Sequence, residues 1–270
     1  MSNAREYYDR TSSEYAAKWA HLDPDTQDPG LYLRGRLIEA VVDMADIQPG
    51  EQVIEIGCGT GLVLKEVLRR TRPVFGTDVS ADMLEQGKKS VLSDVDVQIV
   101  PEFTDSLSPA DVYLTVGDIQ NLSLSPGSFD VVLSLEVLRY VDDVDRALRS
   151  VRGILGDKSR FVFSVTNPMS SSLFPLKYRT RNKLGRVDPE SELLQYFETE
   201  RSIRRKVHSA GLQIVDFRRN ALPIVRRLML RSGASRAKAE KVERIESRFS
   251  EVPLVRTFFD TFLVSTVARR

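Results

Sequence analysis

The sequence predicts an α/β protein organised around a doubly wound, mostly parallel sheet. The first observation is the stretch 53–61 (Val-Ile-Glu-Ile-Gly-Cys-Gly-Thr-Gly), in which a β-branched apolar run ends in three alternating glycines. A helical pattern follows at once, so the stretch predicts a strand, a tight loop and a helix N-terminus. The second observation is the alternation of strand-like and helix-like runs, which is typical of doubly wound sheets. The third is an acidic residue at the end of each of the next two strand-like runs, Asp78 and Asp118.

Two helices are expected before the first strand. The first, residues 3–20, carries a helical stripe at i, i+4, i+7 and i+11 formed by Tyr8, Ser12, Tyr15 and Trp19. This stripe supports two interpretations equally, because it either packs the helix onto the core or forms a lid over a ligand site. Residues 31–47 form the second expected helix, which Pro49-Gly50 stops.

The remaining elements follow in alternation. Strands are expected at residues 52–56, 73–77, 111–117, 129–135, 161–166, 212–218 and 257–267. Helices are expected at residues 60–71, after Ser80, at 142–155 and at 198–210. Three longer stretches interrupt this order: 91–110, where a short extra strand fits, the polar and irregular 168–195, and the basic amphipathic 221–250. Long loops inside a compact domain are often functional.

Composition limits the class of protein. A chain of 270 residues with 41% hydrophobic and 29% charged residues forms one large globular domain, or one domain with appendages. The single cysteine, Cys58, excludes an internal disulfide and suits a reducing compartment. No apolar run approaches the ~20 residues of a membrane span, and the polar start does not resemble a signal peptide. A soluble cytoplasmic protein is therefore expected.

Charge is unevenly distributed along the chain. Residues 171–270 hold 22 Lys and Arg against 11 Asp and Glu, whereas residues 1–170 hold 17 against 27. A basic half attracts anionic substrates, anionic lipid or nucleic acid. Alternatively, these basic residues only form solvated helix faces rich in arginine. The sequence favours the two interpretations about equally.

The order of the glycine loop and the acids indicates a cofactor. Gly-x-Gly-x-Gly alone does not distinguish a ligand loop from a tight turn, but Asp78 follows Gly57 by 21 residues. Doubly wound folds place an acid there against ribose hydroxyls. Together with Glu55, Asp118 and the run 129–136, this succession resembles the class I S-adenosylmethionine-dependent methyltransferases over about residues 48–220. A dinucleotide site is disfavoured because its third glycine falls one residue later.

The resemblance implies S-adenosylmethionine as cofactor and a role for each matching residue. Glu55 would orient the methionine end through the loop, Asp78 would take both ribose hydroxyls, and Asp118 would meet the adenine amino group. Ile119 would pack on the adenine ring. The implied cofactor-binding residues are Glu55, Gly57, Cys58, Gly59, Gly61, Asp78, Val79, Met83, Asp118, Ile119 and Leu135. No metal site is expected.

The resemblance also implies the architecture. The sheet would have seven strands in the order 3-2-1-4-5-7-6, with strand 7 antiparallel. Residues 1–47 would form an N-terminal helical lid or cap, and residues 48–270 a Rossmann-like domain with insertions at 91–110, 168–195 and 221–250. Ligands of open α/β sheets bind outside the carboxyl ends of the strands, so the larger insertions are natural walls for the acceptor.

The segment after the fourth expected strand narrows the subclass. It is Glu136-Val137-Leu138-Arg139-Tyr140-Val141, where quinone, lipid and natural-product methyltransferases often have Glu-Val-Leu-Glu-His-Val. The chain resembles that group, but Tyr140 stands in place of the histidine. A tyrosine is a poor base near neutrality because its pKa is ordinarily about 10. Cytosine C5, adenine N6, metal-dependent catechol and protein arginine methyltransferases are disfavoured because their motifs are absent.

The expected function is methyl transfer to an O, N or C atom of a small-molecule or lipid-like acceptor, for which an anionic group is one option. The candidate catalytic residues are Tyr140 and His21. The candidate acceptor-binding residues are Tyr8, Tyr15, Trp19, Glu136 and Tyr140. Residues 221–250 favour a cap over the acceptor pocket, and peripheral contact with an anionic membrane is the alternative.

Two other classes of function stay open. One is an RNA or protein methyltransferase that uses the basic half, and the other is a cofactor-binding protein without catalysis. DNA is not an expected partner.

Overall fold

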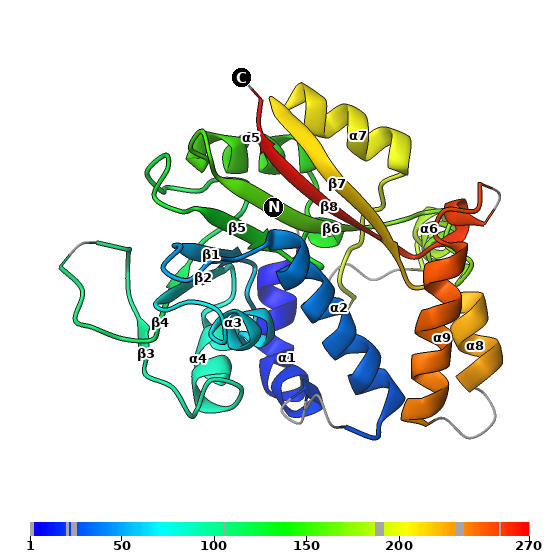
Figure 1. Cartoon of the computed structure of the whole chain (residues 1–270), viewed down its shortest axis with the longest axis horizontal. Coiled ribbons are helices and arrows are strands. Elements are labelled where there is room, and N and C mark those ends of the chain that lie inside the picture. The colour runs from blue at the N-terminus through cyan, green and yellow to red at the C-terminus, as the bar shows by residue number, and fades with distance from the viewer. Residues whose placement is uncertain are drawn as a thin grey trace.

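The computed structural model describes residues 3–19, 22, 26–104, 106–186, 192–230, 235–253 and 255–269. Within these ranges a sheet of eight strands forms the centre of the molecule, with helices on both of its faces (Figure 1). The strands are β1 Val53–Ile56, β2 Val74–Asp78, β3 Val97–Ile99, β4 Val112–Val116, β5 Val131–Ser134, β6 Arg160–Thr166, β7 Leu212–Asn220 and β8 Thr261–Ala268.

The strand order confirms the predicted fold class. Along the sheet the order is β3-β4-β2-β1-β5-β6-β8-β7. Every neighbouring pair from β3 to β6 is parallel, and β8 runs antiparallel to both β6 and β7. The seven expected strands therefore occur in the order 3-2-1-4-5-7-6. β3 is an eighth strand at the sheet edge, inside the expected insertion 91–110.

Helices pack on both faces of the sheet. They are α1 Ala4–Trp19, α2 Pro29–Ala45, α3 Leu62–Val67, α4 Ala81–Lys89, α5 Val144–Ile154, α6 Phe174–Lys183, α7 Glu200–Ser209, α8 Pro223–Leu230 and α9 Arg236–Phe249, with the short turns η1 Leu138–Tyr140 and η2 Arg256–Phe258. Side chains of α2, α3 and α4 share one core cluster with the sheet, and side chains of α5 and α7 share a second. The sheet is thus buried on both faces, as parallel sheets require.

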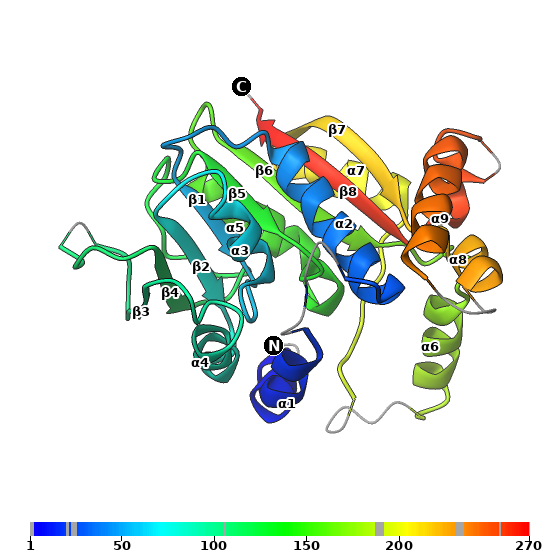
Figure 2. The ribbon, with the colours of Figure 1, turned by 60° about the horizontal axis from the view of Figure 1, so that its bottom comes forward.

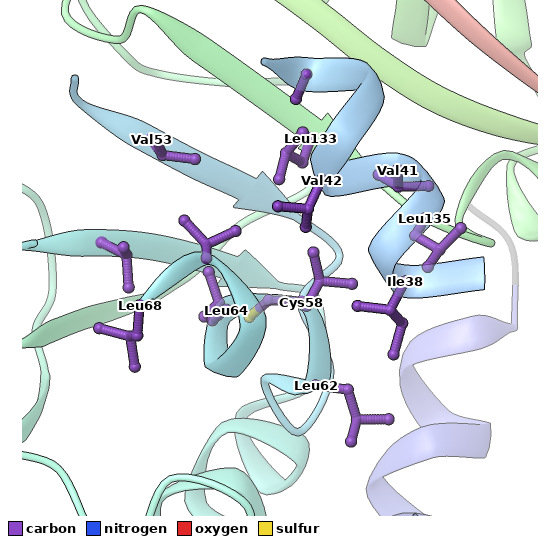
Figure 3. Packing of buried hydrophobic residues seen from close by; sticks show 14 of the residues in the cluster. Ile38, Val41, Val42, Val53, Cys58, Leu62, Leu64, Leu68, Leu133 and Leu135 are labelled. Atoms are coloured by element: carbon purple, nitrogen blue, oxygen red, sulfur yellow. The ribbon is translucent and has the colours of Figure 1, made fainter. Parts of the chain in front are cut away.

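The first core cluster holds the glycine loop in place. Figure 3 shows Val42 of α2, Val53 of β1, Cys58 of the loop and Leu64 of α3 meeting in one packed group. Burying a side chain of this size stabilises a fold by about 1.5–3 kcal/mol. Helix α2 belongs to this cluster. Helix α1 lies outside it, at the carboxyl ends of the parallel strands (Figure 2).

The stretch expected to be irregular, 168–195, contains the helix α6. Its exposed and largely polar sequence has no helical apolar stripe, so periodicity could not reveal it. Only Pro175 and Tyr178 of α6 are buried. Pro175 lies in the first turn, where proline is compatible with a helix.

Residues 221–250 contain α8 and α9, which pack on each other. The Arg226 guanidinium of α8 donates to the Glu246 carboxylate of α9 at 2.7 and 2.8 Å. Glu243 of α9 accepts from the Tyr32 hydroxyl at 3.1 Å and from the Arg36 guanidinium at 2.8 Å, both on α2. The pair of helices is therefore attached to the outer side of α2.

Candidate active site

The glycine loop after β1 turns over the carboxyl end of β2. Gly57 and Gly59 have φ of 75° and 55°, a left-handed conformation that glycine adopts without strain. A Cβ on Gly57 would lie 2.2 Å from a methyl carbon of Val137, so no larger residue fits there. The Gly57 N–H donates to the Thr77 carbonyl at 2.6 Å, and the Gly59 N–H donates to the Asp78 carboxylate at 2.8 Å. The protein's own hydrogen bonds therefore hold the loop against β2.

Asp78 is the buried anchor of this loop. Its other carboxylate oxygen accepts from the Ser80 N–H at 3.0 Å, and the Ser80 hydroxyl caps α4 by accepting from the Met83 N–H at 3.1 Å. Burial raises the pKa of Asp78, an effect that the N–H groups of Ser80 and Gly59 oppose. One carboxylate thus joins the glycine loop to the N-terminus of α4.

The residues predicted to bind cofactor and acceptor gather around one cavity. It has a volume of about 440 Å³ and lies between α1 and the carboxyl ends of β1, β2, β4 and β5. Figure 2 shows α1 beside these strand ends. The predicted residues in its walls are Tyr8, Tyr15, Trp19, Gly57, Gly59, Asp78, Val79, Met83, Asp118, Ile119, Leu135, Glu136 and Tyr140.

Three predicted cofactor residues lie behind the loop and not in the cavity wall. Glu55 is buried, and its Oε2 atom has no hydrogen-bond partner among the described residues. Burial raises the pKa of Glu55 well above its ordinary value. Cys58 points into the core (Figure 3), and Gly61 precedes α3 where a Cβ would lie 2.7 Å from Leu92. Sequence spacing does not show which side of a tight loop a residue faces.

The cavity fits a nucleoside cofactor with a charged tail. Its volume falls within the ~300–1,000 Å³ range of ligand pockets. The carboxyl groups of Asp78 and Asp118 are acceptors for hydroxyl and amino groups, and Ile119 and Met83 supply apolar surface. The buried unpaired oxygen of Glu55 lies behind the loop, outside the wall of this cavity.

Aromatic rings of α1 meet the segment after β5. The Tyr8 ring lies edge-on to the Tyr140 ring at a centroid distance of 5.8 Å and to the Tyr15 ring at 6.0 Å. Tyr15 continues the row to Trp19 at 6.3 Å. Edge-to-face pairs of this kind contribute about 0.5–1.5 kcal/mol each beyond area burial. The predicted stripe of α1 therefore faces the cavity.

Tyr8 and Tyr15 are neutral at physiological pH. Burial raises the pKa of Tyr8, and the nearby Tyr140 raises it further. Burial also raises the pKa of Tyr15 to about 12, although the Arg34 guanidinium opposes the shift. The hydroxyls of Tyr8 and Tyr15 can donate or accept hydrogen bonds, but neither is a ready proton acceptor.

Other residues that line the cavity were not predicted from the sequence. They are Ala4, Arg5, Lys18, Arg34, Ile56, Val116, Gly117, Gln120, Val137 and Val141. The most informative is Arg34 of α2, whose side chain is only 12% exposed. It forms an ion pair with Glu136, and its guanidinium lies 5.3 Å from the centre of the Trp19 ring. No sequence pattern links Arg34 to Glu136, because the contact joins residues 102 positions apart.

Glu136 is ionised because two arginines face it. Burial alone would raise its pKa, but the Arg34 and Arg139 guanidinium groups outweigh that effect and lower the pKa below its ordinary value. Its φ of 60° is unusual for a residue with a side chain, and its N–H donates to the Ser164 hydroxyl at 2.7 Å. The structure thus holds a carboxylate at the junction of β5, α2 and α1.

We expect Arg34→Met to lower the free energy of unfolding at pH 7 by about 1–3 kcal/mol, because a partly buried carboxylate loses its cation. The folded-state pKa of Glu136 is lowered, so this stabilisation is complete above pH 4.5 and is lost as the pH falls through the folded-state pKa. Urea denaturation between pH 7 and pH 3 measures both effects. The control Arg69→Met breaks an exposed pair with Glu66 and should cost less than about 1 kcal/mol. Equal losses in the two variants would contradict the assignment.

A second cavity adjoins the first. It has a volume of about 610 Å³ and shares Tyr8, Tyr15, Lys18 and Tyr140 with the first cavity. Its outer wall comes from α6 and the segment 192–195, through Phe174, Tyr178, Arg181, Glu192, Leu193 and Gln195. We call it the acceptor groove, for the role that we propose for it. No described residue of α8 or α9 lines it or the first cavity, so the cap expected from 221–250 stays a prediction.

Of the two histidines, only His208 lies among the described residues. His21, a candidate base, lies outside the described residues, so its position stays a prediction. His208 is on α7, where its Nε2 atom forms a hydrogen bond with Arg269 at 2.5 Å. Helix α7 is on the opposite side of the sheet from α2 and α3, and His208 lines neither of the two cavities.

A doubly wound sheet whose glycine loop and strand-end acids surround one cavity defines a class I S-adenosylmethionine-dependent methyltransferase. The chain belongs to the methyltransferase domain family, whose family model matches residues 31–216. S-adenosylmethionine is accordingly its cofactor. The match begins at α2 and ends in β7, so it includes the glycine loop and both acids.

Individual relatives are distant. An uncharacterised 37.1 kDa transposon protein of Streptomyces fradiae is 32% identical over 125 residues, which cover 45% of this chain and 32% of that protein. The ubiquinone/menaquinone biosynthesis C-methyltransferase UbiE of Caulobacter vibrioides is 25% identical over 196 residues, which cover 66% of this chain and 74% of that enzyme. The chain thus spans about a third of the first relative and three quarters of the second.

Solved structures share the fold. The magnesium protoporphyrin IX methyltransferase of Synechocystis, with bound S-adenosylhomocysteine, superposes with a TM-score of 0.60 at 15% identity. The superposition covers 99% of this chain and 98% of that chain. Within the part of the chain that the structure describes, no helix is long and apolar enough to cross a membrane. The same residues contain no group of three or more His, Cys, Asp or Glu that could hold a metal ion.

Proposed function

We propose that the protein transfers a methyl group to an O, N or C atom of a small-molecule or lipid-like acceptor that binds in the acceptor groove. The observation that supports this proposal is that the two cavities adjoin. Residues Tyr8, Tyr15, Lys18 and Tyr140 belong to both walls. An acceptor in the groove would therefore reach the cofactor where the two cavities meet, beside these four side chains.

Asp78 and Asp118 would hold the ribose and the adenine amino group, with Ile119 and Met83 against the adenine ring and Glu55 behind the loop for the amine. When bound there, S-adenosylmethionine supplies an electrophilic methyl carbon on a sulfonium sulfur. The chain's own task is to hold the acceptor in line with that carbon and to exclude water. Orientation of this kind can lower a barrier by ~7–11 kcal/mol at the upper limit.

Tyr8, Tyr15 and Glu136 favour an acceptor that is already nucleophilic, whereas His21, the other candidate base, lies outside the described residues. Tyr8 and Tyr15 have raised pKa values, and Glu136 is a weak base because Arg34 and Arg139 stabilise its ionised form. A hydroxyl of ordinary acidity needs a base nearby. A nucleophilic carbon, an amine or an acidic phenol needs less assistance. We therefore expect the acceptor to belong to one of these three kinds.

The experiment is a screen of metabolites that measures S-adenosylhomocysteine release by the intact protein. Quinone precursors, aryl amines, acidic phenols and simple alcohols form the panel. Turnover of one of the first three kinds, with none for the alcohols, supports the proposal. Cofactor binding by calorimetry without turnover on any member, on an RNA or on a protein substrate would favour a non-catalytic cofactor-binding protein.

We expect Tyr140→Phe to lower kcat/KM by roughly threefold to tenfold, the effect of one positioning hydrogen bond of about 0.5–1.5 kcal/mol. The Tyr8→Phe variant removes the hydroxyl of the neighbouring ring and should give a similar loss. The pH profile of kcat should not change. A loss above about a hundredfold in Tyr140→Phe, with loss of one limb of that profile, would instead make Tyr140 the general base.

A further inference from the structure

Large apolar side chains are exposed mainly at one end of the molecule. Among the described residues, the most exposed are Leu228 of α8, at 69%, and Leu176 and Leu184 in and after α6, at 60% each. Most of the others lie in 169–184 and 224–258. Scattered apolar residues on a surface are ordinary, but a gathered patch usually marks a contact.

Hydrogen bonds bring these segments together into one surface. The Ile224 N–H of α8 donates to the Ser171 hydroxyl at 3.2 Å, and the Ser171 N–H donates to the Phe258 carbonyl at 3.0 Å. Figures 1 and 2 both show α6 and α8 at the end of the molecule away from β3. We call this surface the α6–α8 face, and it consists of Leu173, Leu176, Leu184, Ile224, Leu228 and Phe258.

The α6–α8 face has basic residues around it and no acidic residue in its two helices. Residues 169–186 and 223–230 contain no Asp or Glu, and their basic residues are Lys177, Arg179, Arg181, Lys183, Arg186, Arg226 and Arg227. Arg181 pairs with Glu192, and Arg226 pairs with Glu246. Lys177, Arg179 and Lys183 are exposed and have no ion pair with a described residue.

The exposed apolar side chains that this face takes from the α6 segment are Leu176 within α6, Leu173 just before it and Leu184 just after it, whereas Tyr178 is buried. On α8, Ile224, Arg227 and Leu228 are the exposed residues and share one side. Apolar side chains flanked by lysine and arginine are the pattern of helices that lie in a membrane interface.

We propose that the α6–α8 face docks on an anionic lipid membrane, with its leucines in the headgroup region and its basic residues on lipid phosphates. The basic residues favour anionic lipid as the partner, because a bilayer of anionic lipid supplies both an apolar interior and a continuous negative surface. The opposite face of α6, formed by Phe174, Tyr178 and Arg181, lines the acceptor groove. Docking therefore places the groove beside the bilayer, where an acceptor with an apolar tail would be available.

The test is co-sedimentation of the full chain with vesicles, at low and high salt. Binding is expected to vesicles of phosphatidylcholine mixed with phosphatidylglycerol, and not to phosphatidylcholine alone. Salt should weaken it, because Lys and Arg act through screened charges. The triple variant Lys177→Gln, Arg179→Gln, Lys183→Gln should lower the partition coefficient on the order of a hundredfold, since each basic residue strengthens binding by roughly fivefold. The double variant Leu176→Ser, Leu228→Ser should lower it roughly tenfold or more.

Matched controls remove the same charge or the same kind of apolar side chain elsewhere. The charge control is Lys88→Gln, Lys89→Gln, Arg149→Gln on exposed positions of α4 and α5, and the apolar control is Val215→Ser on β7. Both should bind vesicles like the unchanged protein. No sedimentation with anionic vesicles at low salt, equal losses in the controls, or light scattering that shows a dimer broken by Leu176→Ser, Leu228→Ser would overturn the proposal. S-adenosylmethionine binding, measured by calorimetry, should be unchanged in every variant, so this test is independent of the methyl-transfer chemistry.

Discussion

Asp78→Ala is expected to weaken S-adenosylmethionine binding more than any other single substitution in the cavity. The variant loses charge-assisted hydrogen bonds from the ribose, which contribute about 1.5–3 kcal/mol. It also frees the N–H groups of Gly59 and Ser80, which the carboxylate holds at 2.8 and 3.0 Å. Affinity should therefore fall by at least roughly tenfold to a hundredfold, measured by isothermal titration calorimetry.

Two further variants make the Asp78 result specific. Asp82→Ala removes an exposed carboxylate from the first turn of α4 and should leave the affinity unchanged. Asp78→Asn retains one oxygen that accepts a hydrogen bond, so its affinity should lie between those of Asp78→Ala and the unchanged protein. If Asp78→Ala bound the cofactor as tightly as the unchanged protein, the assignment of this cavity to the cofactor would be wrong.

Deleting residues 1–22 is expected to lower kcat/KM by about a hundredfold or more while the remaining chain still folds. Helix α1 supplies Tyr8, Tyr15 and Trp19 to the cavity, and its loss opens the site to water and misplaces the acceptor. The helix buries only small side chains, Ala4, Ser12 and Ala16. Its attachment includes a hydrogen bond at 2.5 Å from the Ser80 hydroxyl to Asp9. Turnover together with thermal unfolding measures the two effects separately.

Point variants keep this prediction decisive if the truncated chain does not fold. Tyr8→Ala combined with Tyr15→Ala removes cavity walls from an intact helix and should reproduce most of the loss in kcat/KM. The control Glu6→Ala combined with Ser13→Ala changes exposed positions of the same helix and should not alter turnover. Full activity in the tyrosine variant would mean that the stripe only packs the helix onto the protein.

The cofactor end of the site could be predicted from the sequence because its residues lie at strand ends in a fixed order. A strand that ends at Ile56 must place Gly57 and Gly59 at the carboxyl edge of the sheet. Parallel pairing then brings Asp78 to the same edge, and Asp118 follows β4 there. These positions follow from local pattern and from the rule that parallel strands share one edge.

The direction of side chains inside the loop could not be predicted in this way. Cys58 and Gly61 belong to the same motif as Gly57 and Gly59, yet they face the core and Leu92. A tight loop reverses direction within one residue, so its faces depend on what packs against each side.

The acceptor end was decided by tertiary structure. Arg34 meets Glu136 across 102 residues of chain, and Tyr8 meets Tyr140 only because α1 lies on the strand ends. Helix α6 has no apolar stripe, so the outer wall of the groove had no signal in the sequence. By itself, the sequence determined the fold class, the cofactor and the edge of the sheet where the chemistry occurs, because local hydrophobic periodicity and strand-end positions encode them. The tertiary structure alone decided which helices line the groove that we propose for the acceptor, because contacts between distant segments depend on how whole faces pack and not on any local pattern.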